Sequence, residues 1–294
     1  MLRNRHVCVL CMLHWLYLTL SAALAWYYLL VREVPSEDPL LNGYFGQMYS
    51  IGMQNGSDPR FLQGIATLKH FDANQLEGNW PGPESVCTGG TCTRHTINAS
   101  ISIYDWASSY LPAFQRSVVQ GGAQAVMCSY NSINGVPSCA NELMLGKILR
   151  GKWGFQGMVT SDSGAVADIS ENHHYAPDLA SASVDAIKAG CDVESAGWGN
   201  DPSKGIGPWA TGGPYIDYLP GKVKDGSMPE GVIDQALRHT VGLRFRLGLF
   251  DPIADQPYWH VPKDVVASAE HIAAAKDAAS QGMVLLRNEK STLP

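Results

Sequence analysis

The stretch GMVTSDSGA, residues 157–165, has the pattern of a short buried strand that ends in an acid. Apolar Met158 and Val159 and two hydroxylic residues lead directly into Asp162, and Gly164 follows two places later. This aspartate has an ordinary explanation, because Asp is a favoured helix N-cap whose carboxylate accepts backbone N–H groups. The other explanation is that the strand holds the carboxylate in place for chemistry. The stretch alone favours the N-cap, since helix N-caps are common and catalytic acids are rare.

The segments on both sides of this strand alternate between short apolar runs and longer helical patterns. Strands are predicted at residues 64–71, 123–131, 157–162 and 191–195. Helices are predicted at residues 101–122, 141–153 and 178–190, and a last one follows a capping box at Ser227–Glu230. Alternating helices and nearly continuous apolar strands indicate an α/β fold whose parallel sheet is covered on both faces.

Polar side chains gather at the carboxyl ends of these predicted strands. In chain order they are Lys69 and His70, Tyr130 and Asn131, Asp162, and Asp192 or Glu194. The carboxyl ends of parallel strands meet on one face, which is where α/β folds build their active sites. Four strands that deliver such groups to one rim make a functional role for Asp162 as credible as the N-cap.

The composition indicates a globular chain. Of the 294 residues, 45% are hydrophobic and only 16% are charged, which suggests a large buried fraction. The formal charge of −6 offers no basic surface, so nucleic-acid binding is not expected. Eight tryptophans and twelve tyrosines fit either core packing or aromatic platforms for sugars.

Residues 1–31 form a separate segment. Arg3 and Arg5 precede an almost uncharged apolar run at residues 7–31. The run resembles a secretory signal with a small-x-small cleavage site at residues 23–25, and it is also long enough to span a bilayer as a helix. With either a signal peptide or a membrane anchor we expect the remainder to be extracellular, as a secreted or a membrane-anchored protein in an oxidising compartment.

The cysteine spacing agrees with an oxidising compartment. Cys87 and Cys92 bracket a short glycine-bearing loop, and Cys128 and Cys139 bracket a turn marked by Asn-Gly and Val-Pro steps. We predict one disulfide in each pair and a small buried role for Cys191. A zinc site is the competing interpretation, but the C-x₄-C spacing lacks a matching second half. We therefore expect no metal.

Two N-glycosylation sequons are present, at Asn55 and Asn98. They fit an exported glycoprotein, although such triplets also arise by chance. No cofactor is expected.

Eight stretches, in the expected order, resemble glycoside hydrolase family 3, within it the β-xylosidase and related β-glucosidase branch. They are VPSEDPLLNG (34–43), ATLKHFDA (66–73), TRHTINASIS (93–102), AVMCSYNSINGVPSCAN (125–141), ILRGKWGFQGMVTSDSGAV (148–166), DAIKAGCDVE (185–194), LRFRLGLFD (243–251) and SQGMVLLRNEKSTLP (280–294). The resemblance covers nearly everything from residue 34 onward.

The resemblance implies a retaining exo-glycosidase on a (β/α)₈ TIM-type barrel, with Asp162 as the nucleophile. It also implies that Lys69 and His70 hold hydroxyls of the terminal sugar and that Arg94 and Tyr130 complete that subsite. Ordinary roles remain open for these four, for example a solvated lysine or a surface arginine. Lys69 and His70 can reach one sugar only where the strand ends or bulges, because neighbouring strand residues point to opposite faces.

The pair His173 and His174 has two explanations. Paired histidines after a catalytic strand suit metal binding or proton transfer. The loop of family members that use a histidine as the acid is absent here, since KHFDANQ stands at residues 69–75. We therefore interpret the pair as structural or as lining the sugar subsite.

The chain departs from the family pattern at both ends. Upstream, the stretch that donates a sugar-binding arginine is replaced by the hydrophobic leader, with Arg32 where a glutamine usually stands, so the first barrel strands are expected to be missing. Downstream, the acid/base glutamate belongs to a second domain, and no glutamate here matches its motif. We expect a leader at 1–31, a partial, incomplete barrel at 32–250, and a linker towards an absent C-terminal domain at 251–294.

The functional expectation is a β-D-xylosidase, or next a β-glucosidase, that acts on the non-reducing ends of β-linked oligosaccharides in plant cell-wall xylan. A barrel with an open edge and no proton donor is expected to be inactive or impaired. The alternative is a non-catalytic carbohydrate-binding protein or a membrane-tethered remnant.

Overall fold

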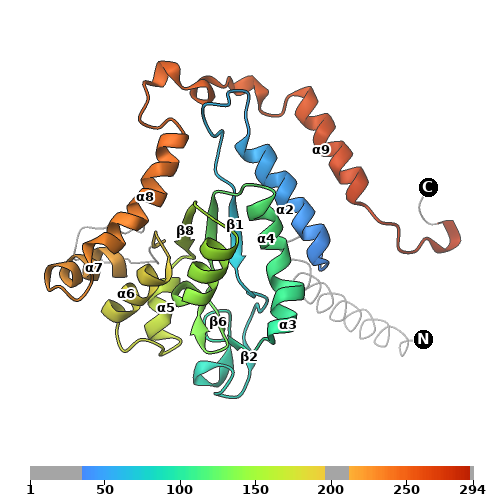
Figure 1. Cartoon of the computed structure of the whole chain (residues 1–294). Coiled ribbons are helices and arrows are strands. Elements are labelled where there is room, and N and C mark those ends of the chain that lie inside the picture. Colours follow the sequence, from blue (N-terminus) through green and yellow to red (C-terminus); the bar gives the residue numbers. More distant parts are fainter. Residues whose placement is uncertain (1–34, 196–211, 292–294) are drawn as a thin grey trace, which may run out of the picture. The chain divides into compact units, whose positions relative to one another are not determined.

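The structure is a computed structural model that describes residues 35–195 and 212–291 (Figure 1). The predicted leader at residues 1–31 lies outside these ranges. The contacts within the chain divide it into two units, Met1–Leu247 and Gly248–Pro294, which are described separately.

The centre of the first unit is a parallel sheet of three strands in the order β1-β5-β8. These strands are β1 (Thr67–Phe71), β5 (Ala125–Cys128) and β8 (Met158–Ser161). Val126 of β5 pairs with Leu68 on one side and with Val159 on the other. Val126 and Val159 are fully buried, as expected for apolar strands inside a parallel sheet. The parallel α/β arrangement predicted from the alternation is confirmed.

Helical segments connect the strands. Between β1 and β5 lie α3 (Ile103–Asp105), a π-helical stretch (Trp106–Tyr110) and α4 (Leu111–Val119). Between β5 and β8 lies a second π-helical segment (Leu143–Lys152), and β8 is followed by α5 (Ala165–Glu171) and α6 (Leu179–Ala189). Before β1, α2 (Pro39–Gln54) packs beside α4 (Figure 1). The predictions found the helices at 101–122, 141–153 and 178–190 but missed α2 and α5.

The hydrophobic core forms where the helices cover the sheet. Phe71 is fully buried and contacts the ring of Phe114 edge-on, with centroids 4.9 Å apart, and that of Trp153 at 5.9 Å. Burying one such ring stabilises the fold by roughly 1.5–3 kcal/mol. The interior face of the second π-helical segment supplies three more buried side chains, Met144, Leu145 and Leu149.

Two small sheets lie at the carboxyl ends of the central strands. One pairs β2 (Trp80–Pro81) with β3 (Thr91–Cys92), and the other contains β4 (Asn98–Ala99), β6 (Ser132–Ile133) and β7 (Val136–Pro137). The β6–β7 hairpin turns at Asn134 and Gly135, which both have positive φ (50° and 87°). Asn-Gly is the residue pair that such a turn favours, and the predicted turn is confirmed.

The predicted disulfides are present. Cys87 is joined to Cys92 and Cys128 to Cys139, while Cys191 is a free and buried cysteine. The second disulfide closes the loop that contains the β6–β7 hairpin, so it ties the carboxyl end of β5 to the residues after β7.

Two further helices close the first unit, α7 (Pro214–Lys224) and α8 (Glu230–Arg246), and a second small core of Ile187, Leu219, Met228 and Ala236 forms with them. The predicted capping box at Ser227–Glu230 is wrong. The predicted helix is present as α8, but its N-cap is Pro229, whose side chain has no hydrogen-bonding atom. The Ser227 hydroxyl donates to the Lys222 carbonyl in the preceding turn.

The prediction of a strand at residues 191–195 is also largely wrong. There, Val193 makes a single parallel bridge to Thr160 of β8. The chain therefore continues the direction of the sheet without forming a ladder.

The second unit contains short 3₁₀ turns and α9 (Ala269–Gly282). Ser268 caps α9, since its side chain accepts the N–H of His271. Across residues 35–195 and 212–291, none of the helices combines the length and apolar character that a membrane crossing needs.

Candidate active site

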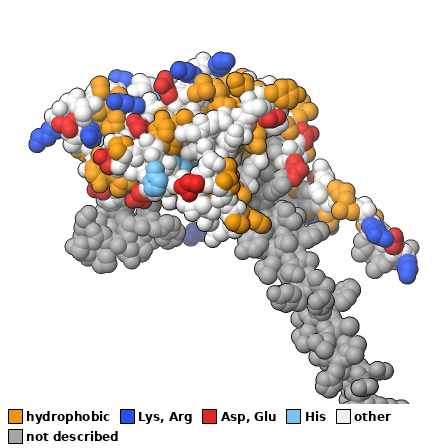
Figure 2. Space-filling model, turned by 90° about the horizontal axis from the view of Figure 1, so that it is seen from below, with side chains coloured by type: hydrophobic (Ala, Val, Ile, Leu, Met, Phe, Trp, Pro, Cys, Tyr) orange, Lys and Arg blue, Asp and Glu red, His pale blue; other side chains and the backbone are white. Residues whose placement is uncertain are grey.

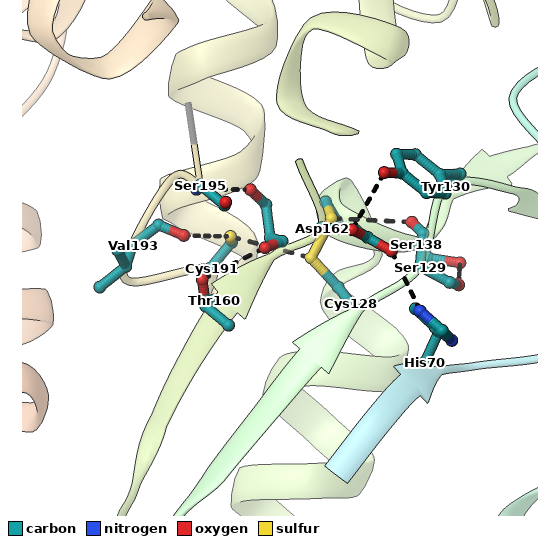
Figure 3. The surroundings of a disulfide bond; sticks show 12 residues. His70, Cys128, Ser129, Tyr130, Ser138, Thr160, Asp162, Cys191, Val193 and Ser195 are labelled. Carbon is teal, nitrogen blue, oxygen red and sulfur yellow. Dashed lines mark hydrogen bonds and ion pairs between the residues drawn. A yellow bond between two sulfur atoms is a disulfide. The ribbon is translucent and has the colours of Figure 1, made fainter. Parts of the chain in front are cut away.

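Asp162 lies directly after β8, at the carboxyl end of the sheet. Its backbone N–H donates to the carbonyl of Cys128 at the end of the neighbouring strand, over 3.1 Å. Its Oδ1 accepts the hydroxyl of Tyr130 at 3.0 Å, and its Oδ2 is 3.2 Å from Nε2 of His70 (Figure 3). The carboxylate is thus held between side chains from two other strand ends, with its side chain 14% exposed.

The N-cap explanation for Asp162 is wrong. Helix α5 begins at Ala165 with Gly164 as its N-cap, and no side chain caps it. Gly164 has φ 79°, a left-handed conformation that suits glycine. Within the segment that connects β8 to α5, Oδ1 accepts only the N–H of the adjacent Ser163. The carboxylate of Asp162 is therefore not used to cap the helix.

The surface around the carboxyl ends of the strands is mixed in character. Strand β1 points downward in Figure 1, so the view from below in Figure 2 faces these ends. Histidine and acidic side chains occur there among apolar ones (Figure 2). This is the face where parallel α/β folds place their active sites.

The segment that carries His70 and Lys69 is irregular. The register between β1 and β5 shifts between Leu68 and Phe71, which is the kind of irregularity that the sequence required if both residues were to face one sugar. His70 is 17% exposed and contacts Asp162, whereas Lys69 has an exposed side chain. The structure brings His70 against the Asp162 carboxylate.

Arg94 lies over the ring of Tyr130, whose hydroxyl contacts Asp162. The guanidinium carbon of Arg94 is 5.0 Å from the centroid of the Tyr130 ring, a cation–π contact, and an Arg94 nitrogen is 3.6 Å from Glu77. Burial first, and then the negative charge of Asp162, raise the pKa of the Tyr130 hydroxyl. The phenol therefore keeps its proton and can donate it in a hydrogen bond to Asp162.

Two histidines near this group have different surroundings. His173 Nε2 is 2.7 Å from the carbonyl oxygen of Tyr130, and burial lowers the pKa of His173, so the neutral ring braces the tyrosine backbone. His174 is exposed and bonds the Ser170 carbonyl through Nδ1. Both contacts are of the structural kind.

Two residues beside this group were missed from the sequence. His95 packs on Tyr130 with ring centroids 4.2 Å apart, and its Nδ1 is 2.7 Å from a carboxylate oxygen of Asp168 in α5. His95 stands next to Arg94 within the quoted TRHTINASIS stretch, which was the available signal. Nothing in the sequence around Asp168 distinguishes it from an ordinary helical acid.

Three other strand-end residues that were expected at the rim serve the fold. Asn131 is fully buried and donates to the Asp72 carbonyl. Asp192 is paired with Arg150 at 2.6 Å and with His239 at 2.8 Å. Glu194 accepts the N–H of Tyr215 at the start of α7 at 2.7 Å, and burial raises its pKa to about 7. The predicted meeting of strand-end side chains at one site therefore holds for His70, Tyr130 and Asp162, and it fails for these three residues.

A sulfur cluster lies next to Asp162. Cys128, Cys139 and Cys191 bring their sulfur atoms within 4.8 Å of one another, and Cys191 Sγ is 3.8 Å from Cys128 Sγ (Figure 3). Two of these sulfurs form a disulfide and lack the thiolate charge that a metal ligand needs. Burial raises the pKa of Cys191 to about 12, so the third is a neutral thiol.

The sequons occupy different surroundings. Asn55 is exposed after α2, whereas Asn98 is half-buried and its Oδ1 accepts the N–H of Gly135 at 2.7 Å. Glycosylation of either asparagine remains a prediction.

Comparison with known proteins identifies the family. The model of the glycosyl hydrolase family 3 N-terminal domain matches residues 32–243, more than half of the chain. The chain belongs to glycosyl hydrolase family 3. The resemblance found in the sequence is thereby confirmed, and with it a TIM-barrel-like α/β fold.

The relatives of this family 3 chain include xylosidases and glucosidases. It is 36% identical over 272 residues to "Probable beta-D-xylosidase 7" of Arabidopsis thaliana and 35% identical over 266 residues to "Exo-1,4-beta-xylosidase bxlB" of Emericella nidulans. These matches cover 90% of this chain and 32% and 31% of the relatives. The chain thus spans about a third of the length of the curated relatives it matches.

Solved structures of family members share the fold. A "GH3 exo-beta-xylosidase (XlnD) in complex with xylobiose aziridine activity based probe" superposes with a TM-score of 0.74 at 30% identity, over 88% of this chain and 31% of that one. A β-glucosidase from Listeria innocua in complex with glucose gives a TM-score of 0.70 at 28% identity, over 89% and 32%.

Proposed function

We propose that this family 3 chain carries the nucleophile and part of the sugar subsite of a retaining β-glycosidase, with Asp162 as the nucleophile. The observation that carries the proposal is the carboxylate of Asp162 at a strand end, held on one oxygen by Tyr130 and on the other by His70. A rigid strand end suits this role because the nucleophilic oxygen must be held about 3–3.5 Å from the anomeric carbon, and a misplacement of about 1 Å can cost roughly 100-fold in rate. The family membership supports the same assignment.

The chemistry proposed for Asp162 has two balanced steps. A carboxylate oxygen attacks the anomeric carbon, a C–O bond forms between sugar and Asp162, and the bond to the leaving oxygen breaks as that oxygen takes up a proton. Water then attacks the anomeric carbon, gives up a proton, and releases the sugar with the Asp162 carboxylate restored. Tyr130 and His70 fix which carboxylate oxygen faces the sugar.

We propose that the proton donor for the leaving oxygen is not among the rim acids of the part of the chain that the structure describes. The rim acids that could serve are engaged elsewhere, Glu194 with the start of α7 and Asp192 with Arg150. General acid–base catalysis is worth roughly 10²–10⁴-fold in rate. We therefore propose little turnover of substrates with poor leaving groups by this chain alone.

The proposed substrates are β-linked oligosaccharides cleaved from their non-reducing ends, with xylosides preferred to glucosides. Xylosidases among the relatives and the small residues Ser163 and Gly164 after the nucleophile support a pentose. The two sugars differ by one hydroxymethyl group, a difference that a pocket discriminates only by a modest factor. The two disulfides support an extracellular location, because such bonds persist in oxidising compartments.

The test uses a substrate that needs no proton donor. 2,4-Dinitrophenyl 2-deoxy-2-fluoro-β-D-xyloside has a leaving group stable as an anion, and its fluorine slows hydrolysis so that the glycosyl ester accumulates. We expect intact-mass spectrometry to show one added fluoroxylosyl group, peptide mapping to place it on Asp162, and Asp162→Asn to abolish it. The matching fluoroglucoside should label more slowly.

The absence of labelling, or a label that persists in Asp162→Asn, would overturn the proposal. Calorimetric titration with xylobiose distinguishes a glycosidase from the alternative, a non-catalytic carbohydrate-binding protein. Binding of xylobiose without labelling of Asp162 would support the alternative.

A further inference from the structure

His95 lies between three side chains of the proposed sugar subsite and its support. Its Nδ1 is 2.7 Å from Asp168 Oδ2, its Nε2 is 3.4 Å from Nε of Arg94, and its ring packs on Tyr130. The His95 side chain is 37% exposed, whereas that of Asp168 is only 9% exposed. One histidine thus joins a buried carboxylate to Arg94 and to Tyr130, the residue that donates to Asp162.

Asp168 is itself held rigidly. It belongs to α5, the short helix that begins three residues after Asp162. Its Oδ1 accepts the side-chain amide of Asn172, and its Oδ2 is left for His95. Because both carboxylate oxygens have donors, the position of this carboxylate relative to the nucleophile loop is well determined.

The carboxylate determines which ring nitrogen of His95 carries the proton. A carboxylate only accepts hydrogen bonds, so Nδ1 must donate to Asp168. In the neutral ring, Nε2 then presents its lone pair, and the Arg94 Nε–H donates to it. The opposite tautomer would place two N–H groups against each other at Arg94 and two acceptors against each other at Asp168.

Arg94 needs such a contact to stay over Tyr130. Its side chain is 43% exposed, and Glu77, its ion-pair partner, is 59% exposed at 3.6 Å. An exposed ion pair of this kind contributes little, about 0–1 kcal/mol, against the rotamer entropy of an arginine. The bond to His95 is directional and anchored in the interior through Asp168, so it selects one rotamer of Arg94.

We propose that Asp168 and His95 are positioning residues that hold Arg94 and Tyr130 in the orientation that the sugar subsite requires. The inference rests on the proposed function, because it deepens the description of that same site. His95 fixes Arg94 through a hydrogen bond and Tyr130 through ring packing, and Tyr130 in turn donates to Asp162.

The experiment separates the two routes by substitution. His95→Phe keeps an aromatic ring against Tyr130 but removes both nitrogens, so it breaks the bonds to Arg94 and Asp168 and leaves the ring contact. His95→Ala also removes the ring. We expect the rate of labelling of Asp162 by the dinitrophenyl fluoroxyloside to fall about 10-fold in His95→Phe and up to about 100-fold in His95→Ala, since small misplacements at a site cost that much. His271→Phe, on exposed α9, is the matched control and should label at the wild-type rate.

A double-mutant cycle then distinguishes positioning from general destabilisation. In an Arg94→Ala background, His95→Phe should cost less than two-fold more, because the group through which it acts is gone. Two results would overturn the inference while the proposed function stands. One is an equal loss of labelling rate from His95→Phe with and without Arg94→Ala, and the other is an unchanged labelling rate in His95→Phe alone.

A second measurement does not depend on labelling. Nitrogen-15 chemical shifts of the His95 ring in the full chain should place the proton of the neutral form on Nδ1, and Asp168→Ala should abolish that preference. A proton on Nε2 in the wild-type chain would overturn the inference. Absence of labelling in the wild-type chain overturns the proposed function and the inference together.

Discussion

Asp192 supplies the sharpest stability prediction, because its carboxylate serves three elements at once. It accepts from Arg150 Nη2 at 2.6 Å and from the backbone N–H of Val159 in β8 at 2.7 Å, and it lies 2.8 Å from His239 Nδ1 in α8. The side chains of Asp192 and Arg150 are 4% and 17% exposed. Burial lowers the pKa of Arg150, and the Asp192 charge opposes that effect. Asp192 therefore compensates the positive charge of this buried arginine.

The expected loss in Asp192→Ala is about 3–5 kcal/mol in the free energy of unfolding. Removing one partner of a buried ion pair costs that much because the other charge is left without compensation. The orphaned N–H of Val159 adds to the cost, since an unmade buried hydrogen bond costs roughly 1–3 kcal/mol and the two contributions overlap. Asp192→Asn keeps one acceptor oxygen and should lose about half as much. Against a total stability of about 5–15 kcal/mol these are large changes.

Urea unfolding at pH 7, followed by tryptophan fluorescence and by circular dichroism, measures the loss. Asp234→Ala, an exposed acid on α8, is the matched control and should change stability by less than about 0.5 kcal/mol. The double variant Arg150→Met with Asp192→Ala should be more stable than the sum of the single losses predicts, by at least about 1 kcal/mol. A loss below about 1 kcal/mol in Asp192→Ala, or strictly additive losses, would refute the reasoning.

Three further outcomes are expected. Burial raises the pKa of Asp72 to about 6 from 3.8, despite the hydrogen bond from Trp106. The native state thus binds this proton more tightly than the unfolded state, and about 3 kcal/mol of stability should be lost as the pH rises from about 4 to about 6. Urea unfolding measured across this pH range should show a smaller change of stability in Asp72→Asn. The pKa of Glu194, raised to about 7, has the same sign, so the melting temperature should fall as the pH rises from about 4.5 to 7 and Glu194→Gln should reduce that fall. Cys139→Ser opens the disulfide to Cys128 and should cost about 2–4 kcal/mol in urea unfolding of the oxidised chain, a loss that an unchanged midpoint would contradict.

Features that depend on neighbours in the chain were predictable from the sequence. The apolar runs around Leu68, Val126 and Val159 predicted the three central strands, because short runs rich in apolar residues between turn signals are typical of strands in a parallel sheet. The Asn134–Gly135 step predicted the hairpin turn for an equally local reason, the positive φ that these residues tolerate. Asp162 was found by its place at the end of such a strand.

Features that depend on competition between partners were not predictable. Ser227 has the sequence of a capping residue, yet its hydroxyl bonds the carbonyl of Lys222 and the helix starts without it. Asp192 and Glu194 have the strand-end position of site residues, yet one neutralises Arg150 and the other holds the start of α7. In each case the choice was made by a group that the local sequence does not show.

By itself, the sequence determined the order of the three central strands and of the helical segments between them, the cysteine pairs and the position of Asp162 at a strand end, since each follows from residue type and short spacing. Only the tertiary structure decided that Tyr130 and His70 hold that carboxylate and that Asp168 reaches His95 across 73 positions of the chain. The reason is that a hydrogen bond needs two atoms within about 3 Å, and packing alone brings distant segments that close.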